Sequence, residues 1–205
     1  MNVALLGSGS GTLIADMLEN GIRPTIVLAD NANSSCKVIE IASQHADAHH
    51  YSAHTVIFSR WGTFKNGVCD YGRIGYTRVL MELLHKLEIE LVVMAGWMTV
   101  FSADIFADFA VTNIHPSLFG PDNAALYPGA HAVRDALQAG ASETGSTVHV
   151  ATPLLDAGQP LGSSRVPILP GDTEEVLHER MKVEERPLYT RIVQDIIDGV
   201  IKVAA

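Results

Sequence analysis

The sequence predicts an α/β fold, with an open, mostly parallel Rossmann-like sheet and helices on both of its faces. Short apolar segments rich in β-branched residues alternate with longer segments of helical spacing. This alternation is typical of parallel strands that are joined by helices. A glycine-rich turn over residues 7–12 joins the first such strand to the first helix. With 205 residues and 47% apolar content, the chain is long enough for one well-buried core, so we expect a single domain over residues 1–205.

The first half of the chain contains four expected strands and three expected helices. The strands are short and apolar, and they lie at Val3 to Leu6, Thr25 to Ala29, His54 to Ile57 and Leu91 to Met94. The helices have apolar residues at helical spacing, and they lie at Leu13 to Leu18, Cys36 to Ala46 and Arg73 to Leu87. The polar segment Asp30 to Asn33 is an expected turn. Because Leu91 to Met94 is apolar at every position, we expect a central strand that is covered on both faces.

The second half continues the alternation. Strands are expected at Val111 to Ile114, Thr147 to Thr152 and Gly162 to Ile168, and a helix at Ala130 to Ala139. The segment from Phe119 to Gly129 is rich in Gly, Pro, Asp and Asn, which indicates a loop. Asp172 followed by Glu175 resembles a capping box that begins a last helix. We expect Pro187 to interrupt or kink that helix.

The composition limits the kinds of partner. A formal net charge of -9 argues against a nucleic-acid partner, because phosphate backbones are bound by clustered Lys and Arg. We therefore expect small-molecule substrates and a monomer or homodimer. Cys36 and Cys69 have no paired spacing and are expected to be free thiols in a reducing compartment. The longest apolar stretch, Leu91 to Phe101, is too short to cross a bilayer. The residues that follow Met1 do not form a basic targeting sequence. We therefore expect a cytoplasmic protein without a membrane partner.

The most informative polar residues lie at the end of the fifth expected strand. Asn113 and His115 are two residues apart in an extended segment, so their side chains project from the same face. Pro116 stiffens the exit from this strand, and open α/β sheets bind ligands at such strand ends. An amide beside an imidazole can hold a carbonyl oxygen and move a proton, which predicts acyl-transfer chemistry. Asp156 either completes this set or is an ordinary turn residue before Gly158.

Other motifs each allow two interpretations. The glycine turn over residues 7–11 either cradles a phosphate at a helix N-terminus or is a tight turn without a ligand. Asp30 lies where dinucleotide-binding folds keep a ribose-binding acid, but the third glycine comes one residue early for that motif. His149 either faces the site or is a satisfied structural residue. The histidines at 45, 49, 50 and 54 lack acidic or cysteine ligands at useful spacing, so a solvated helix end is the better interpretation and no metal is expected.

Five motifs together carry a family resemblance. They are Leu91 to Met98, Asn113 to Leu118, Tyr127 to Gly129, Gly145 to His149 and Leu155 to Gly158. In this order they resemble the formyltransferase family over nearly the whole chain. The resemblance implies transfer of a formyl group from 10-formyltetrahydrofolate, as co-substrate, to an amine without a metal. Within the family the likeness is greatest to members that formylate glycinamide ribonucleotide in purine biosynthesis, and the alternative acceptors are an amino sugar or water.

The resemblance also implies roles for individual positions. Asn113, His115 and Asp156 fall on the catalytic triad of the family. The ribonucleotide would be bound by Ser10, Gly11, Thr12, Arg73, Lys182 and Glu185. The folate pocket would comprise Trp97, Met98, Thr99, Val100 and Phe101 together with Thr152 and Leu155. Asn113 and protonated His115 would then stabilise the oxyanion that develops during transfer.

Some positions depart from the family pattern. Thr12 is followed directly by Leu13, so the Asn that usually helps to hold the phosphate is missing, and Thr99 stands where the family commonly has Arg. A loop lengthened by Gly120 to Asn123 is expected to reshape the acceptor entrance. The chain ends soon after its last helix, which favours the free-standing purine enzyme over relatives with an extra domain. A nucleotide-binding oxidoreductase or sensor that uses Gly7, Gly9 and Asp30 is the competing hypothesis from another class.

Overall fold

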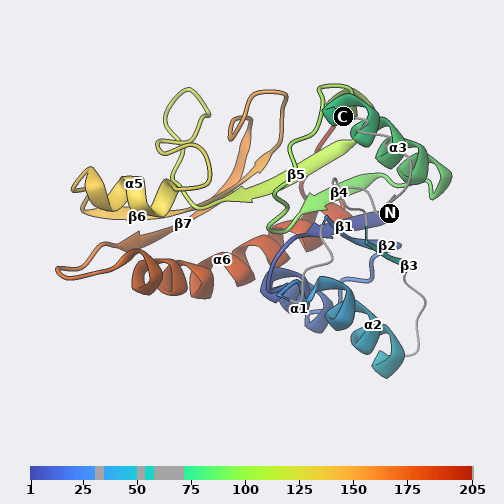
Figure 1. The fold of residues 1–205 in the computed structure, drawn as a ribbon, viewed down its shortest axis with the longest axis horizontal. Coiled ribbons are helices and arrows are strands. Elements are labelled where there is room, and N and C mark those ends of the chain that lie inside the picture. The colour runs from blue at the N-terminus through green and yellow to red at the C-terminus, as the bar shows by residue number, and fades with distance from the viewer. Residues whose placement is uncertain (31–34, 50–53, 58–71, 205) are drawn as a thin grey trace. The chain divides into compact units, whose positions relative to one another are not determined.

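A computed structural model describes residues 1–30, 35–49, 54–57 and 72–204 (Figure 1). Seven strands form one sheet in the order β3-β2-β1-β4-β5-β6-β7. The parallel pairs join β1 (Val3–Gly7) to β2 (Ile26–Ala29), β1 to β4 (Leu91–Met94), and β2 to β3 (His54–Ile57). The antiparallel pairs join β5 (Ala110–His115) to β6 (Glu143–Val150), and β6 to β7 (Pro160–Pro167). The predicted α/β fold with an open, mostly parallel sheet is confirmed.

The chain divides into two compact units. The first unit spans Met1–Val111 with the last two residues, and the second unit spans Thr112–Val203. The boundary falls inside β5, just before the two residues predicted to do chemistry. The single domain over residues 1–205 stays a prediction.

The described residues of the first unit form β1 to β4 and four helices. The helices are α1 (Thr12–Glu19), α2 (Val38–His49), α3 (Gly72–Lys86) and α4 (Ile105–Asp108). Figure 1 shows α1 and α2 on one side of these strands and α3 on the other. Every residue of β1 and β2 is buried, and β4 is buried except for the partly exposed Met94. Apolar strands of this kind need cover on both faces, which explains why the sequence alternates strands with amphipathic helices.

The second unit packs β6 and β7 against α6 (Glu174–Ile197) and adds α5 (Ala132–Gln138). A cluster of buried apolar side chains joins α5, β7 and α6, formed by Val133, Val166, Leu177 and Met181. Farther along α6, the hydroxyl of the fully buried Tyr189 lies 3.0 Å from Oγ1 of Thr112 on β5. This polar contact satisfies both hydroxyls in the core and fixes α6 against the strand that carries Asn113.

The predicted interruption at Pro187 and the predicted capping box are wrong, whereas a kink at Pro187 stays a prediction. α6 continues without interruption through Pro187, because buried side chains on both sides of the proline outweigh a cost of about 3 kcal/mol for its missing N–H and its steric clash. The helix begins one residue later than the expected capping box. Thr173 is the N-cap and accepts a hydrogen bond from the backbone N–H of Val176. Asp172 instead accepts from the backbone N–H of Leu169 and from the Arg180 guanidinium.

The remaining element boundaries differ modestly from expectation. β6 begins at Glu143 instead of Thr147, because β7 supplies hydrogen-bonding partners as far as Pro167. The short helix α4 was not predicted. Most of the expected turn from Asp30 to Asn33 lies outside the described residues, as does Cys69. In the described ranges no helix is long and apolar enough to cross a membrane.

Candidate active site

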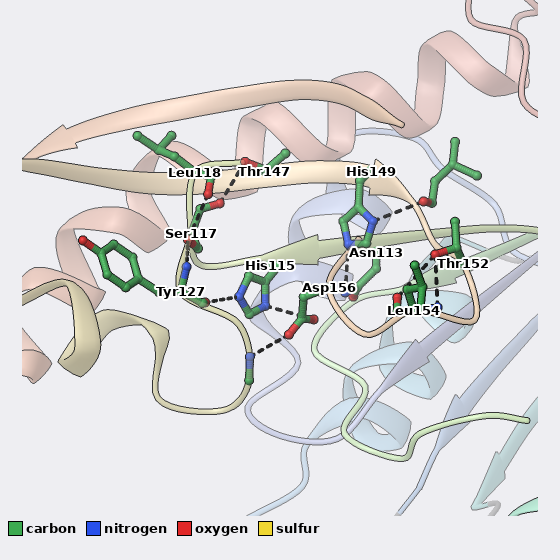
Figure 2. A network of polar contacts seen from close by, with 12 residues as sticks. Asn113, His115, Ser117, Leu118, Tyr127, Thr147, His149, Thr152, Leu154 and Asp156 are labelled. Carbon is green, nitrogen blue, oxygen red and sulfur yellow. Dashed lines mark hydrogen bonds and ion pairs between the residues drawn. The ribbon is translucent and has the colours of Figure 1, made fainter. Parts of the chain in front are cut away.

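β5 delivers the predicted amide and imidazole to one place in the second unit. It pairs antiparallel with β6, so Asn113 lies opposite His149 and His115 lies opposite Thr147. His115 is buried and Asn113 is half-buried. Figure 2 shows their side chains close to the carboxylate of Asp156. The strand pairing therefore places both predicted side chains and brings His149, whose role the sequence left open, beside Asn113.

His115 is held between two hydrogen-bond acceptors (Figure 2). Its Nδ1 lies 3.2 Å from Oδ1 of Asp156, and its Nε2 lies 2.8 Å from the backbone carbonyl oxygen of Tyr127. A carbonyl oxygen can only accept, so Nε2 carries a proton and donates it. The carboxylate also accepts, so Nδ1 is a second donor. Two acceptors favour an imidazolium paired with a carboxylate, which is a charged proton donor in a buried site.

Asp156 reaches His115 from a tight turn. Its second carboxylate oxygen, Oδ2, accepts a hydrogen bond from the backbone N–H of Gly129 at 2.7 Å, so both oxygens have partners. The backbone of Asp156 is left-handed, with φ of 49°, a conformation that Asp adopts more readily than most residues. A Cβ at Gly158 would collide with the carbonyl oxygen of Val150, so this position accepts only glycine. Asp156 is thus both a turn residue and the partner of His115, although the sequence offered these two roles as alternatives.

His149 orients the amide of Asn113. Its Nδ1 lies 3.2 Å from the carbonyl oxygen of Val150, and its Nε2 lies 3.4 Å from Nδ2 of Asn113. Because the carbonyl only accepts, Nδ1 carries the proton of a neutral ring, and the bare Nε2 accepts from the amide. Burial lowers the pKa of His149, and the nearby His115 charge lowers it further, which favours this neutral form. One N–H of the Asn113 side-chain amide is thereby fixed. Because the amide group is planar, the direction of its second N–H is fixed as well.

Ser117 is a residue whose role the sequence analysis missed. It is fully buried, its hydroxyl accepts from the backbone N–H of Tyr127 at 3.0 Å, and its carbonyl accepts from Oγ1 of Thr147 at 2.8 Å. These bonds fix the Tyr127 backbone, whose carbonyl oxygen accepts from Nε2 of His115. A small hydroxyl residue directly after the His-Pro pair was the available signal.

The glycine turn of the first unit ends at the start of α1. Gly11 is the N-cap, with φ of 72° and no side-chain cap. A Cβ at this buried position would lie 2.9 Å from Cδ1 of Ile41, so both φ and packing require glycine. Ser10 and Thr12 are exposed, and their hydroxyls lie 3.5 Å apart. A helix N-terminus of this kind offers backbone N–H groups to an anion.

The segment Trp97 to Phe101 alternates between buried and exposed side chains. Trp97, Thr99 and Phe101 are buried, whereas Met98 and Val100 are 67% and 44% exposed. Thr99 donates a hydrogen bond of 2.9 Å to the buried carboxylate of Asp30, so the acid considered for a ribose has a protein partner. The segment is also held through the backbone N–H of Met98, which donates to Ser8 Oγ at 2.9 Å. Exposed apolar side chains therefore stand on a fixed backbone.

The other predicted site residues have distinct surroundings. Arg73 is exposed in the first turn of α3. Lys182 pairs with Glu179 at 2.6 Å on the surface of α6. Glu185 is buried, and its Oε2 accepts from Ser146 Oγ at 2.8 Å.

The loop after β6 contributes two more of the predicted residues. The Thr152 hydroxyl donates to the carbonyl oxygen of Ala157 at 3.1 Å, and Leu155 is exposed. Thr152 therefore ties the loop back onto the Asp156 turn.

The described part of the chain contains no group of three potential metal-binding side chains. His45 and His49 stack on α2 with ring centroids 4.2 Å apart, and Cys36 is a free thiol. His50 lies outside the described residues.

A family model described as formyl transferase matches residues 1–193. The chain belongs to the formyl transferase family. It is similar to the phosphoribosylglycinamide formyltransferase of Escherichia coli (strain K12), with 30% identity over 98% of this chain and 90% of that protein. It is 32% identical to the enzyme of the same name from Mycobacterium tuberculosis (strain ATCC 25618 / H37Rv), over 93% of this chain and 82% of that protein. Among solved structures it resembles glycinamide ribonucleotide transformylase 1 from Symbiobacterium toebii, with a TM-score of 0.79, 28% identity, and 100% and 91% of the two chains covered.

In this formyl transferase, the burial of neutral His149 makes the free energy of unfolding depend on pH. Since the pKa of His149 is lowered from 6.5 in the folded chain, the unfolded chain binds more protons below pH 6.5. The stability that neutral His149 contributes is therefore present above pH 6.5 and is lost progressively as the pH falls from that value through the lower pKa of the folded chain. Urea unfolding across this range should show a smaller acid loss for His149→Gln than for the wild type. Equal pH dependence in the two proteins would contradict this account.

Proposed function

We propose that this formyl transferase moves the formyl group of 10-formyltetrahydrofolate to the amine of glycinamide ribonucleotide, a step of purine biosynthesis. The observation that carries the proposal is the buried imidazole of His115, held between the carboxylate of Asp156 and the carbonyl oxygen of Tyr127, beside an oriented Asn113 amide. Such a pair can stabilise negative charge on a carbonyl oxygen and supply a proton without a metal. The names of the similar proteins support this acceptor.

The proposed reaction forms one bond to the formyl carbon and breaks another. The substrate amine attacks the formyl carbon, and its oxygen gains negative charge that the Asn113 amide and the His115 imidazolium stabilise. The oxyanion would accept the Nε2–H that His115 otherwise donates to the Tyr127 carbonyl. The bond from the formyl carbon to the folate nitrogen then breaks. The amine loses a proton and the folate nitrogen gains one, with Asp156 and His115 as the relay.

The substrate contacts are proposed one unit at a time. In the first unit we assign the phosphate to the α1 N-terminus, through Ser10, Gly11, Thr12 and Arg73, and the folate to the fixed segment Trp97, Met98, Thr99, Val100 and Phe101. In the second unit we assign folate contacts to Thr152 and Leu155, and ribonucleotide contacts to Lys182 and Glu185.

Glu185 is well suited to such a role. A buried carboxylate with Ser146 on one oxygen can receive substrate N–H groups on the other. To bind the substrate, Lys182 would have to give up only its surface ion pair with Glu179. Surface ion pairs contribute little to stability.

Small molecules are the proposed partners, and we place the enzyme in the cytoplasm as a monomer or homodimer. A chain of net charge -9 does not attract nucleic acid, which agrees with this proposal. The competing oxidoreductase hypothesis is not supported by the family of the chain, which is that of the formyl transferases; the Asp30 carboxylate considered for a ribose already accepts one hydrogen bond from Thr99.

The acceptor is tested by incubating the protein with 10-formyltetrahydrofolate, with and without glycinamide ribonucleotide. We expect release of the deformylated folate to require the ribonucleotide, because the amine is the attacking nucleophile. A panel of amino sugars in place of the ribonucleotide serves as the control. Folate release at the same rate without any amine would identify a hydrolase, and transfer to an amino sugar alone would identify a different acceptor.

A further inference from the structure

The loop around Gly120, which we predicted to be longer than in the family, forms a hairpin. The backbone N–H of Leu126 donates to the carbonyl oxygen of Leu118 at 2.9 Å, and that of Gly120 donates to Ala124 at 2.8 Å. Phe119 and Ala125 form an antiparallel bridge between its two arms. We call residues 118–126 the support hairpin. Its internal bonds give the loop a defined backbone, whereas the sequence suggested only an altered entrance for the acceptor.

The support hairpin is bonded to the turn that carries Asp156. The backbone N–H of Ala125 donates to the carbonyl oxygen of Asp156 at 2.9 Å. The backbone N–H of Gly158 donates to the carbonyl oxygen of Asn123 at 2.9 Å, and Ala124 bridges Ala157 between these two bonds. The hairpin therefore holds the turn through two hydrogen bonds, one at Asp156 and one at Gly158.

The two hydrogen bonds from the support hairpin hold a turn whose backbone conformation is unfavourable. Asp156 has φ of 49° and Gly158 has φ of 133°. A left-handed residue other than glycine costs free energy and persists only where its surroundings impose it. The direction of the Asp156 carboxylate toward His115 depends on this conformation. The two bonds from the support hairpin are therefore placed to hold the catalytic contact.

Asn123 is the residue of the support hairpin that aims one of these bonds. Its own backbone is left-handed, with φ of 57°, and Asn is enriched in that region. Its side chain is exposed, so its carbonyl oxygen is the group that contacts the turn. We propose that Asn123 is a positioning residue, whose left-handed backbone holds Asp156 against His115. The effect on rate rests on the proposed function, whereas the contact between Asp156 and His115 does not.

Three variants separate positioning from general stability. Asn123→Val places a β-branched residue where φ is positive, which opposes the required conformation. Asn123→Gly permits that conformation and removes only the exposed side chain. Glu88→Val is the matched control, because Glu88 is also exposed and left-handed, with φ of 51°, but lies in the turn between α3 and β4. Both valine variants introduce the same kind of backbone strain.

The first readout is the imidazole N–H proton that His115 donates to Asp156, followed by NMR on histidine-labelled protein. We expect Asn123→Val to shift or lose this downfield signal, and Asn123→Gly and Glu88→Val to keep it. The second readout is steady-state formyl transfer. We expect kcat of Asn123→Val to fall by about tenfold to 100-fold, the scale of a displaced catalytic group, with KM little changed. Glu88→Val should lower the midpoint of thermal unfolding without lowering kcat.

Each outcome has a distinct meaning. An unchanged His115 signal in Asn123→Val overturns the proposal, and so does an equal loss in Asn123→Gly, which would show that the side chain is what matters. Equal losses of kcat in the two valine variants would show a stability effect alone. If the wild type shows no formyl transfer while the NMR signal responds as expected, the proposed function fails and the positioning role stands.

Discussion

Asp156→Asn is expected to lower kcat by about 10⁴, the scale observed where Asn replaces the aspartate that orients a catalytic histidine. In the wild type the backbone N–H of Gly129 donates to Oδ2 of Asp156. In the variant this N–H will bind the amide oxygen of the new Asn side chain. The amide NH₂ then faces Nδ1 of His115, which must become an acceptor. His115 is left neutral, with its remaining proton on Nε2, and the cation that would stabilise the oxyanion is lost. Single-turnover formyl transfer measures the effect.

The control for this variant is Asp104→Asn, a carboxylate that forms an exposed ion pair with Arg78 in the first unit. Its kcat should equal that of the wild type. Both variants should keep the far-UV circular dichroism of the parent, since the substitution preserves side-chain volume. Near-normal turnover of Asp156→Asn would show that the buried pair of His115 and Asp156 is structural.

Asn113→Ala is expected to lower kcat by about 10² to 10³, the usual loss on removal of one oxyanion donor. His149 accepts one N–H of the Asn113 amide and so orients the group, and alanine removes both of its N–H donors. KM for the two substrates should change much less than kcat, because the lost interaction forms mainly in the transition state. Initial-rate kinetics with both substrates varied will separate kcat from KM.

A double variant with His115→Ala provides the internal check on this prediction. If Asn113 and His115 stabilise the same oxygen, the two losses will combine to less than their product. Strictly multiplicative losses would place the two residues at independent steps. A loss in Asn113→Ala confined to KM would argue that the amide binds substrate without assisting the chemistry.

Much of the fold was predictable because its signals are local. Apolar runs such as Leu91 to Met94 identified buried strands, and glycine at position 11 marked the turn into α1. Asn113 and His115 could be placed on one face of a strand because side chains alternate with a period of two. Each of these inferences uses residues close together in the chain.

Other features could not be predicted from local patterns. α6 continues through Pro187 because packing along the helix outweighs the local cost of proline. The roles of His149 and Ser117 depend on the antiparallel pairing of β5 with β6 and on the fold of the loop after β5. The family resemblance suggested positions for the folate and ribonucleotide contacts, which stay predictions.

The sequence alone therefore determined the fold class, the strand that is proposed to carry the chemistry, and the pairing of an amide with an imidazole on one face. Tertiary structure alone decided that Asp156 meets His115, that both ring nitrogens of His115 lie beside hydrogen-bond acceptors, and that the support hairpin holds the Asp156 turn. The physical reason is that side-chain alternation is a property of a short backbone segment. A contact between distant segments instead depends on strand pairing, on left-handed backbone at specific residues, and on hydrogen bonds between loops that no local pattern encodes.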